Sequence, residues 1–455
     1  MDLGFETIGN ATLICHDRGP VLATDPWIIG SAYFNSWTLS HTIPDEQMEA
    51  IKGCKYVWIS HGHPDHLSVE SLAPLKDKII LVPDHVGGRI ASDLRGLGYK
   101  VTILRDGQWT TLAPRLHILC IATYNQDGIL LVDIGGTLIV NFNDGTPLGW
   151  ASFVKGIIRQ YKHTFLLRLF GYGDADMINF VDENGRRFEP VAGKRFPVGR
   201  NIQLYAEGCG IRNVIPFSSM HKYQRSDSAW ANQYTTPLPD LRIGFDSTKC
   251  TLLPAFISYD CTKGLPREIR PDETQSRLLD PKECGDDWDE PLDPTDNQRL
   301  RRYFRSIEAL HRAVDFISFR VGGHDHIIEL SARGFKTGVR FEVPRNSLMQ
   351  TIDNECFDDL LIGNFMRTCL IGKWPKYGLY PDFAPYVAKY ADNGRARTTE
   401  ELRLYFREYR KRAPVEYVGH RLEEWAFNYV RRHVSPNSQL LNTARGALKS
   451  ALGRF

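Results

Sequence analysis

The seven residues Ser60-His61-Gly62-His63-Pro64-Asp65-His66 place three imidazoles and a carboxylate within one short stretch. They directly follow the apolar, strand-like segment Lys55–Ile59, and helix-like patterning resumes over residues 67–72. Neutral imidazole and carboxylate are the usual protein ligands of zinc and of non-haem iron. The simpler alternative is a polar loop that carries histidine by chance, but three of the chain's fourteen His gather here. The stretch therefore predicts a metal-binding loop.

The backbone explains the spacing of these side chains. A strand that ends at Ser60 passes into a tight loop, in which Gly62 allows a bend and Pro64 stiffens the path of the chain. Asp65 and His66 then fall at the expected start of a helix. Ligands carried by a strand end and a helix start are held rigidly, as a metal site requires.

The composition is that of an ordinary globular protein. The chain has 455 residues, 42% of them hydrophobic and 24% charged, and roughly two or three units are expected at this length. A formal net charge of +2 gives no reason to expect nucleic acid as a partner. The nine Cys are scattered without a C-x-x-C pair, which argues against a disulfide framework, a zinc ribbon and an iron–sulfur cluster.

Neither end of the sequence nor its interior suggests a membrane protein. The segment Met1–Thr7 lacks the basic region and apolar core of a signal peptide. No apolar run approaches the ~20 residues that a membrane-spanning helix needs. We therefore expect a cytoplasmic enzyme.

The chain divides into two parts of different texture. Residues 1–240 alternate short apolar strands with helix-like stretches, which is typical of an α/β sandwich whose sheets are flanked by helices. Residues 280–296 are acidic and Pro-rich, which predicts a surface loop. Residues 241–455 otherwise combine amphipathic helices with a few strands, so we expect an additional C-terminal α+β accessory or substrate domain.

Three segments of the first part resemble a known family. They are residues 24–33, 56–68 and 140–144, and the second contains the spacing H-x-H-x-D-H. This spacing resembles the signature of the metallo-β-lactamase superfamily, and the three segments together resemble the metallo-β-lactamase-like half of CMP-N-acetylneuraminate hydroxylase. The resemblance covers mainly residues 1–240 and implies an αββα sandwich. The hydroxylases also carry a Rieske cluster domain, which we expect this chain to lack.

The resemblance implies a set of metal ligands. In this superfamily the first two His of the signature hold one metal, and the Asp with the last His holds a second. Asp144 matches a later carboxylate that both metals share, although it also fits an Asx turn before Gly145. His221 matches a late His for the second metal, although it also fits a core or surface His. The implied ligands are His61, His63, Asp65, His66, Asp144 and His221, with Asp65 and Asp144 as the catalytic residues.

One ligand of the family's set is missing from this sequence. A third His is expected between the strands that end at Ile121 and begin at Ile129, where residues 122–128 carry none. Asn125 or Asp127 would supply an oxygen donor instead, or water would take the position, or the site would hold a single metal. An oxygen-rich site favours iron or manganese over zinc. We expect one or two metal ions, with iron ahead of zinc.

Other polar residues have alternative explanations. Asp25, at a strand end before Pro-Trp, is either a carboxylate that orients a metal-bound His or an ordinary turn residue. His117 lies inside a strand rather than at its end. His324 and His326 form a second H-x-H pair, which fits a turn or strand edge better than a metal site.

Three classes of function remain open. The preferred one is an iron-dependent oxygenase or hydroxylase of a polar, small-molecule biosynthetic substrate, with electrons from a separate donor or from the substrate. The alternative is a zinc-type metallohydrolase of a lactone, amide or phosphoester, in which the metal lowers the pKa of bound water to roughly 7. The third is a non-catalytic metal-binding or scaffolding protein.

The substrate is expected to be selected by residues 149–200 and by the C-terminal domain. The candidate anion-binding side chains are equally explained as solvated surface, and they are Arg159, Lys162, Arg168 and Arg225. The basic segment Arg403–Arg412 alternates with Glu and aromatic residues, which predicts an exposed helix face.

Overall fold

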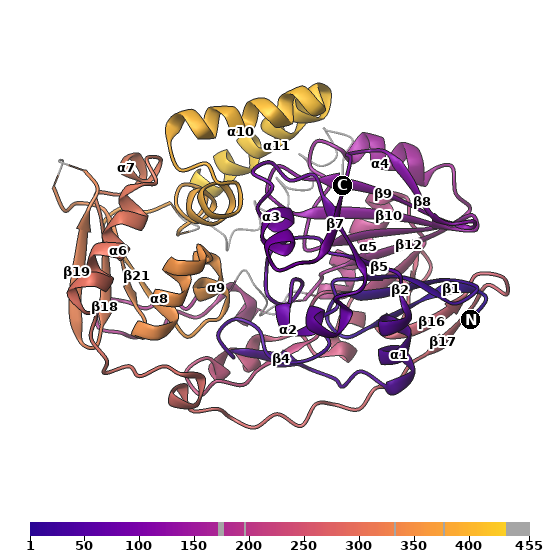
Figure 1. Cartoon of the computed structure of the whole chain (residues 1–455), viewed down its shortest axis with the longest axis horizontal. Coiled ribbons are helices and arrows are strands. Elements are labelled where there is room, and N and C mark those ends of the chain that lie inside the picture. The colour runs from indigo at the N-terminus through magenta and orange to yellow at the C-terminus, as the bar shows by residue number, and fades with distance from the viewer. Residues whose placement is uncertain (172–176, 195–196, 332–333, 376–377, 434–455) are drawn as a thin grey trace.

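Two large sheets face each other in the computed structural model, which describes residues 1–171, 177–194, 197–331, 334–375 and 378–433 (Figure 1). The first sheet has the strand order β17-β16-β1-β2-β3-β5-β6-β7. Strands β3, β5, β6 and β7 are mutually parallel, whereas β1 and β2 pair antiparallel. Its strands are β1 (Leu3–Ile8), β2 (Thr12–Asp17), β3 (Pro20–Thr24), β5 (Tyr56–Trp58), β6 (Ile79–Pro83), β7 (Lys100–Leu104), β16 (Ile257–Asp260) and β17 (Leu265–Glu268).

The second sheet has the strand order β15-β13-β12-β11-β10-β9-β8. Its centre is formed by β10 and β11, whose side chains are almost all buried, as expected for strands covered on both faces. Strands β11, β12 and β13 run parallel, so their carboxyl ends meet at one edge. Its strands are β8 (Trp109–Ala113), β9 (Leu116–Ala122), β10 (Gly128–Ile134), β11 (Thr137–Asn143), β12 (His163–Arg168), β13 (Asn213–Pro216) and β15 (Thr251–Leu252).

Helices cover the outer face of each sheet. One apolar core, which includes Phe5, Trp58 and Phe165, lies between the sheets. Helices α1 (Asp45–Gly53), α2 (Val69–Leu72) and α3 (Arg89–Gly96) pack on the first sheet. Helices α4 (Ala151–Ile158) and α5 (Val198–Cys209) pack on the second. The expected αββα sandwich is confirmed.

Three strands that follow residue 240 belong to the sandwich. Strand β15 pairs with β13, β16 pairs with β1, and β17 pairs with β16. The sandwich therefore continues to Glu268. We propose that the division between the two units lies after this residue, rather than between residues 240 and 241.

A smaller α+β unit follows the sandwich and lies on the left of Figure 1. Its sheet has the order β19-β18-β20-β21, and its core includes Phe304, Phe319, Phe341 and Phe357. Its strands are β18 (Phe316–Val321), β19 (His324–Glu329), β20 (Gly338–Glu342) and β21 (Arg367–Ile371). Its helices are α6 (Pro294–Arg305), α7 (Leu310–Ala313), α8 (Arg345–Asn354) and α9 (Phe357–Ile362).

The prediction of a surface loop over residues 280–296 is wrong in part. Helix α6 already begins at Pro294, with Asp293 as its N-cap in a reciprocal capping box. Asp286 is buried and forms a 2.7 Å ion pair with the equally buried Arg225. Acidic composition alone does not reveal that one of its carboxylates has a buried cationic partner.

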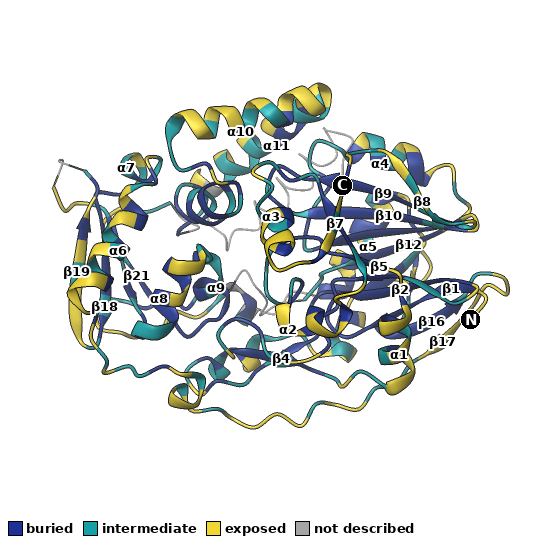
Figure 2. Ribbon diagram, in the orientation of Figure 1, coloured by how far each residue is buried: buried dark blue, intermediate teal, exposed yellow. Residues whose placement is uncertain are grey.

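The last described elements connect the two units. They are the π-helix Pro385–Asn393 and the helices α10 (Thr399–Arg412) and α11 (Pro414–His433). Helix α10 exposes the predicted charged face, as Figure 2 shows, but Tyr405 and Tyr409 on its other face are buried. No described helix is long and apolar enough to cross a membrane. Residues 434–455, which belong to the predicted helices at the C-terminus, lie outside the described residues.

The buried tyrosines of α10 hold a loop of the sandwich. The Tyr405 hydroxyl donates to the backbone oxygen of Tyr124 at 2.7 Å and accepts from the Gln126 side-chain amide at 2.9 Å. The Tyr409 hydroxyl donates to the backbone oxygen of Thr123 at 3.0 Å. Because this loop lies where the missing third His is expected, the second unit fixes its position.

Replacing Tyr405 by Phe leaves the Tyr124 carbonyl and the Gln126 amide without this partner in a buried place. We expect the free energy of unfolding to fall by about 1–3 kcal/mol, measured by urea denaturation. Tyr429→Phe is the control, because Tyr429 is 55% exposed. Equal unfolding midpoints for the two variants would contradict this role of Tyr405.

Candidate metal centre

The candidate donors follow the carboxyl ends of strands from both sheets. Asp25 follows β3, the signature loop follows β5, Asp144 follows β11, and Ser218 lies shortly after β13. Parallel strands bring their carboxyl ends to one edge, which is the usual place for a binding site in such sheets. The hydrogen bonds described below show that these four loops meet.

A first group of donors consists of His61, His63 and Asp144. His61 Nε2 and His63 Nδ1 face each other at 2.8 Å, and Asp144 Oδ2 lies 3.9 Å from His61 Nε2. One ligand atom from each of the three side chains lies within 4.8 Å of the others. Two imidazoles and a carboxylate at this spacing are able to hold one metal ion.

A second group of donors shares Asp144 with the first. His66 Nε2 lies 3.2 Å from Asp65 Oδ2 and 3.4 Å from Asp144 Oδ2. Although burial opposes a charge on the ring, the carboxylates of Asp65 and Asp144 raise the pKa of His66 well above its usual value. Burial also opposes a charge on Asp65, but His66 lowers its pKa. The structure thus brings Asp65, His66 and Asp144 together.

His221 reaches this group from strand β14 (His221–Tyr223), which pairs with β4 (Trp37–Leu39). Its ring stacks on Trp37 with centroids 3.4 Å apart and planes 1° from parallel. Burial lowers the pKa of His221 to about 3, although the charge of Asp65 opposes this shift. The ring is therefore neutral at physiological pH, which is the form that binds a metal.

Each His of the signature is held by its other ring nitrogen. His61 Nδ1 lies 2.9 Å from Ser60 Oγ, and His66 Nδ1 lies 3.2 Å from Asp25 Oδ2. His63 Nε2 lies 3.1 Å from Asp358 Oδ2. Metal-bound His residues commonly have such partners, which fix the tautomer and the orientation of the ring.

Asp25 is therefore an orienting carboxylate rather than an ordinary turn residue. Its Oδ1 accepts from the Ser60 backbone amide at 2.7 Å, and its Oδ2 accepts from the Asn143 side chain at 2.5 Å. Ser218 in turn donates to the Asn143 side-chain oxygen. Burial raises the pKa of Asp25, against the contacts with His66 and Ser60.

Asp65 has two outer partners that the sequence did not indicate. Asn10 Nδ2 donates to Asp65 Oδ2 at 2.9 Å, and the Tyr33 hydroxyl donates to Oδ1 at 2.5 Å. The Asn10 side-chain oxygen also accepts from the Met220 amide at 2.9 Å, next to His221. Asn10 thus links Asp65 to the loop that precedes β14.

Unpartnered polar atoms test whether a metal fits these residues. Among the described residues, His66 Nε2, Asp144 Oδ1 and both ring nitrogens of His221 are buried without a hydrogen-bond partner. Such atoms are rare in folded proteins unless water or an ion satisfies them. They all belong to the expected ligands, so the residues fit a bound metal.

The two oxygen donors expected in place of the third His lie at the same site. A cavity of about 140 Å³ is lined by Asn125 and Asp127 together with His61, His63 and Asp144. Burial raises the pKa of Asp127, although the charge of Lys389 opposes the shift. Asp127 is therefore well placed for a cation that keeps it ionised.

The other candidate histidines lie away from this cavity. His117 Nδ1 lies 2.9 Å from Thr111 Oγ1 on the neighbouring strand β8. His324 and His326 lie on β19 of the second unit, where His326 Nδ1 lies 3.2 Å from the Asn297 side chain. The structure gives these three residues no part in the centre.

Of the four expected anion-binding side chains, only Arg168 lines a cavity at this site. Arg225 is buried in ion pairs with Asp227 and Asp286, so its proposed role is wrong. Arg159 and Lys162 are exposed surface residues. The sequence could not separate these cases, because burial of a cation depends on partners distant in the chain.

Asp358→Asn removes the charge that holds His63 Nε2. We expect metal affinity to fall by about 10–100-fold, measured by competition with a chromophoric chelator. Asp289→Asn, at an exposed position, is the matched control. Unchanged affinity in Asp358→Asn would show that Asp358 does not orient His63.

Metal binding should also depend on pH. Although burial opposes the shift, Asp358 raises the pKa of His63 to about 9, and the pKa of His66 is raised as well. Both rings are thus protonated in metal-free protein at neutral pH and must lose a proton to bind. Affinity should therefore rise with pH up to about 9, with release of about two protons at neutral pH. Calorimetry in buffers of different ionisation enthalpy measures this release, and pH-independent binding would contradict it.

The chain is similar in part to known hydroxylases, although no family model matches it. It is 29% identical over 131 residues to the cytidine monophosphate-N-acetylneuraminic acid hydroxylase of Sus scrofa, and 30% identical over 131 residues to that of Danio rerio. Each match covers 27% of this chain. The matches span 30% and 22% of the two relatives, respectively.

Solved structures with some likeness include hydroxylases and hydrolases. CmlA, a diiron β-hydroxylase from Streptomyces venezuelae, has a TM-score of 0.32 at 13% identity and covers 48% of this chain and 45% of its own. Igni18, a metallo hydrolase from Ignicoccus hospitalis, has a TM-score of 0.33 at 13% identity and covers 59% of this chain and 99% of its own. The fold assignment rests on the strand order and helix layers described above. With the hydroxylase match, these features confirm the resemblance to the metallo-β-lactamase superfamily.

Proposed function

We propose that this chain is a metal-dependent enzyme, and more specifically an iron-dependent oxygenase or hydroxylase of a polar small molecule. The donor set at the strand ends carries the proposal. Four imidazoles converge with the carboxylates of Asp65 and Asp144, and Asp127 lines the same cavity. Mixed imidazole and carboxylate ligation suits iron more than the nitrogen- and sulfur-rich sets typical of structural zinc.

The ligands divide into two groups that share one carboxylate. His61, His63 and Asp144 would hold one metal, with Asp127 or Asn125 in place of the missing His. Asp65, His66 and His221 would hold a second metal together with Asp144. When bound, non-haem iron supplies the one-electron and dioxygen chemistry that protein side chains lack.

The protein's own residues prepare the site. Ser60, Asp25 and Asp358 fix the three signature imidazoles, so the donors need little rearrangement. Leu361 and Ile362 line the small cavity beside His63, which limits the water that reaches it. An apolar wall of this kind protects reactive oxygen chemistry from side reactions.

Hydroxylation of a C–H bond with dioxygen consumes two electrons and two protons and yields the alcohol and water. All nine Cys of the chain are free in the structure, without a paired set for a cluster. We therefore propose that a separate reductant supplies the electrons.

Metal analysis by mass spectrometry on protein purified without chelators, combined with oxygen uptake in the presence of dithionite-reduced mediator, tests this function. We expect about two irons per chain and reductant-dependent oxygen uptake, because two donor groups are present. Asp144→Ala should lose most of the metal and the uptake, whereas the exposed control Asp289→Ala should keep both.

Zinc as the sole metal, with no oxygen uptake, would contradict the oxygenase. Turnover of a lactone, amide or phosphoester by that zinc protein would favour the hydrolase instead.

A further inference from the structure

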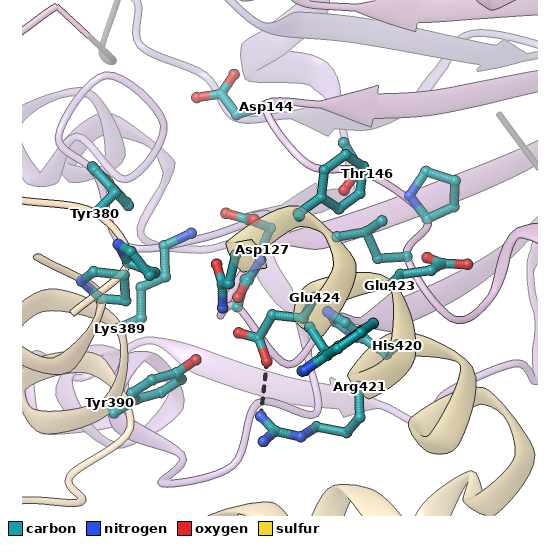
Figure 3. Close-up of a pocket in the computed structure, with 18 of the residues that line it drawn as sticks. Asp127, Asp144, Thr146, Tyr380, Lys389, Tyr390, His420, Arg421, Glu423 and Glu424 are labelled. Carbon is teal, nitrogen blue, oxygen red and sulfur yellow. Dashed lines mark hydrogen bonds and ion pairs between the residues drawn. The ribbon is translucent and has the colours of Figure 1, made fainter. Parts of the chain in front are cut away.

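A second, larger cavity of about 760 Å³ adjoins the candidate metal centre. Its volume lies in the range of small-molecule pockets. Asp127, Asp144 and Lys389 line both this cavity and the smaller one that holds His61 and His63. Figure 3 shows the larger pocket, with Asp144 at one end and Lys389 and Asp127 directed towards its interior. A molecule in this pocket would lie next to the metal ligands.

Two of the cations that line this pocket already have anionic partners. Arg421 forms an ion pair with Glu424 at 2.7 Å, drawn as the dashed line in Figure 3. Arg432 forms an ion pair with Asp382 at 2.6 Å. These charges are balanced within the protein, so they need no ligand.

The two other cations of the pocket are Lys389 and Arg168. Within the described part of the chain, neither has a carboxylate oxygen within 4.0 Å. The Arg168 guanidinium instead lies 3.7 Å from the centre of the Tyr205 ring. Stacking of this kind holds the guanidinium plane in place and leaves its N–H donors available to an anion.

Both unpaired cations lie at the end of the pocket nearest the metal centre. Lys389 lines the small cavity together with His61 and Asp127. Arg168 ends strand β12 and pairs in register with Asn143, the residue before Asp144. The two positive charges thus come from different units of the protein and face one place.

Compensation of Asp127 alone does not account for these cations. The charge of Lys389 acts on Asp127 and on His61 without a direct ion pair. A bound metal ion would be the largest local charge and would already balance the nearby carboxylates. Two further cations beside a metal are electrostatically unfavourable unless an anion joins them.

The rest of the pocket is suited to an uncharged body. Lys389 lies on the π-helix Pro385–Asn393, which also brings Tyr386 and Tyr390 to the wall. Such helices occur frequently at functional sites. His420 adds a buried Nε2 that lacks a hydrogen-bond partner among the described residues. The wall therefore offers aromatic faces and one polar contact.

We propose that this pocket binds an organic oxyanion, a carboxylate or a phosphate, through Lys389 and Arg168. The uncharged part of the molecule lies along Tyr386 and Tyr390, with its reacting carbon towards Asp144. This names the substrate class of the enzyme proposed above and rests on that function, although anion binding itself is measured independently of turnover.

Ligand-observed NMR on the protein as purified, with its metal, tests the proposal using benzoate, phenyl phosphate and the neutral analogue benzamide. We expect benzoate or phenyl phosphate to bind at least about tenfold more tightly than benzamide, because a charge-assisted contact is lost in the amide. Lys389→Met and Arg168→Met should each remove this preference without changing metal content. Lys263→Met, at an exposed turn, is the control and should keep it.

The arms separate the competing explanations. An anion preference that survives in both Lys389→Met and Arg168→Met would place the anion on the metal and overturn the proposal, as would equal binding of benzamide and benzoate. Tighter binding of phenyl phosphate than of benzoate would identify phosphate as the recognised group, and the reverse order would identify carboxylate. Wild-type protein without metal, but with a Lys389-dependent anion preference, would refute the metal enzyme and retain the anion site.

Discussion

The buried carboxylate of Asp25 ties together the three segments on which the candidate metal centre depends. It accepts from the Ser60 amide, faces the His66 ring and accepts from the Asn143 side chain. The Asp25 backbone has a φ of +40°, an uncommon conformation for a residue with a side chain. Strained residues of this kind persist where surrounding contacts over-determine them. The convergence of strand ends from two sheets, and with it the position of His66 and Asp144, follows from this one group.

The second unit completes what the sandwich begins. Asp358 from α9 holds His63, and Lys389 from the π-helix lines both cavities. The tyrosines of α10 fix the loop that carries Asn125 and Asp127. The sandwich alone supplies the expected ligands, whereas the second unit sets their orientation and the shape of the adjoining pocket. Changes in α9, α10 or the π-helix would therefore alter the centre without touching a ligand.

Sequence reasoning predicted the local parts of this arrangement. The signature loop, the apolar strands before it and before Asp144, and the sandwich they form all carry short-range patterns. Asp358 carried no such signal, because an acidic residue in the first turn of a helix is common for reasons of the helix dipole. The domain boundary was placed too early, because β15 has only two residues and β17 is exposed. Arg225 was indistinguishable from a surface cation until its buried partner Asp286 was known.

The central claim is that the strand-end donors form a metal centre with a carboxylate shared between two groups. Anomalous X-ray diffraction at the iron edge, on crystals of protein purified without added metal, tests it most directly. The account predicts one peak among His61, His63 and Asp144 and a second among Asp65, His66, Asp144 and His221. An empty centre, or peaks coordinated by other residues, would contradict it.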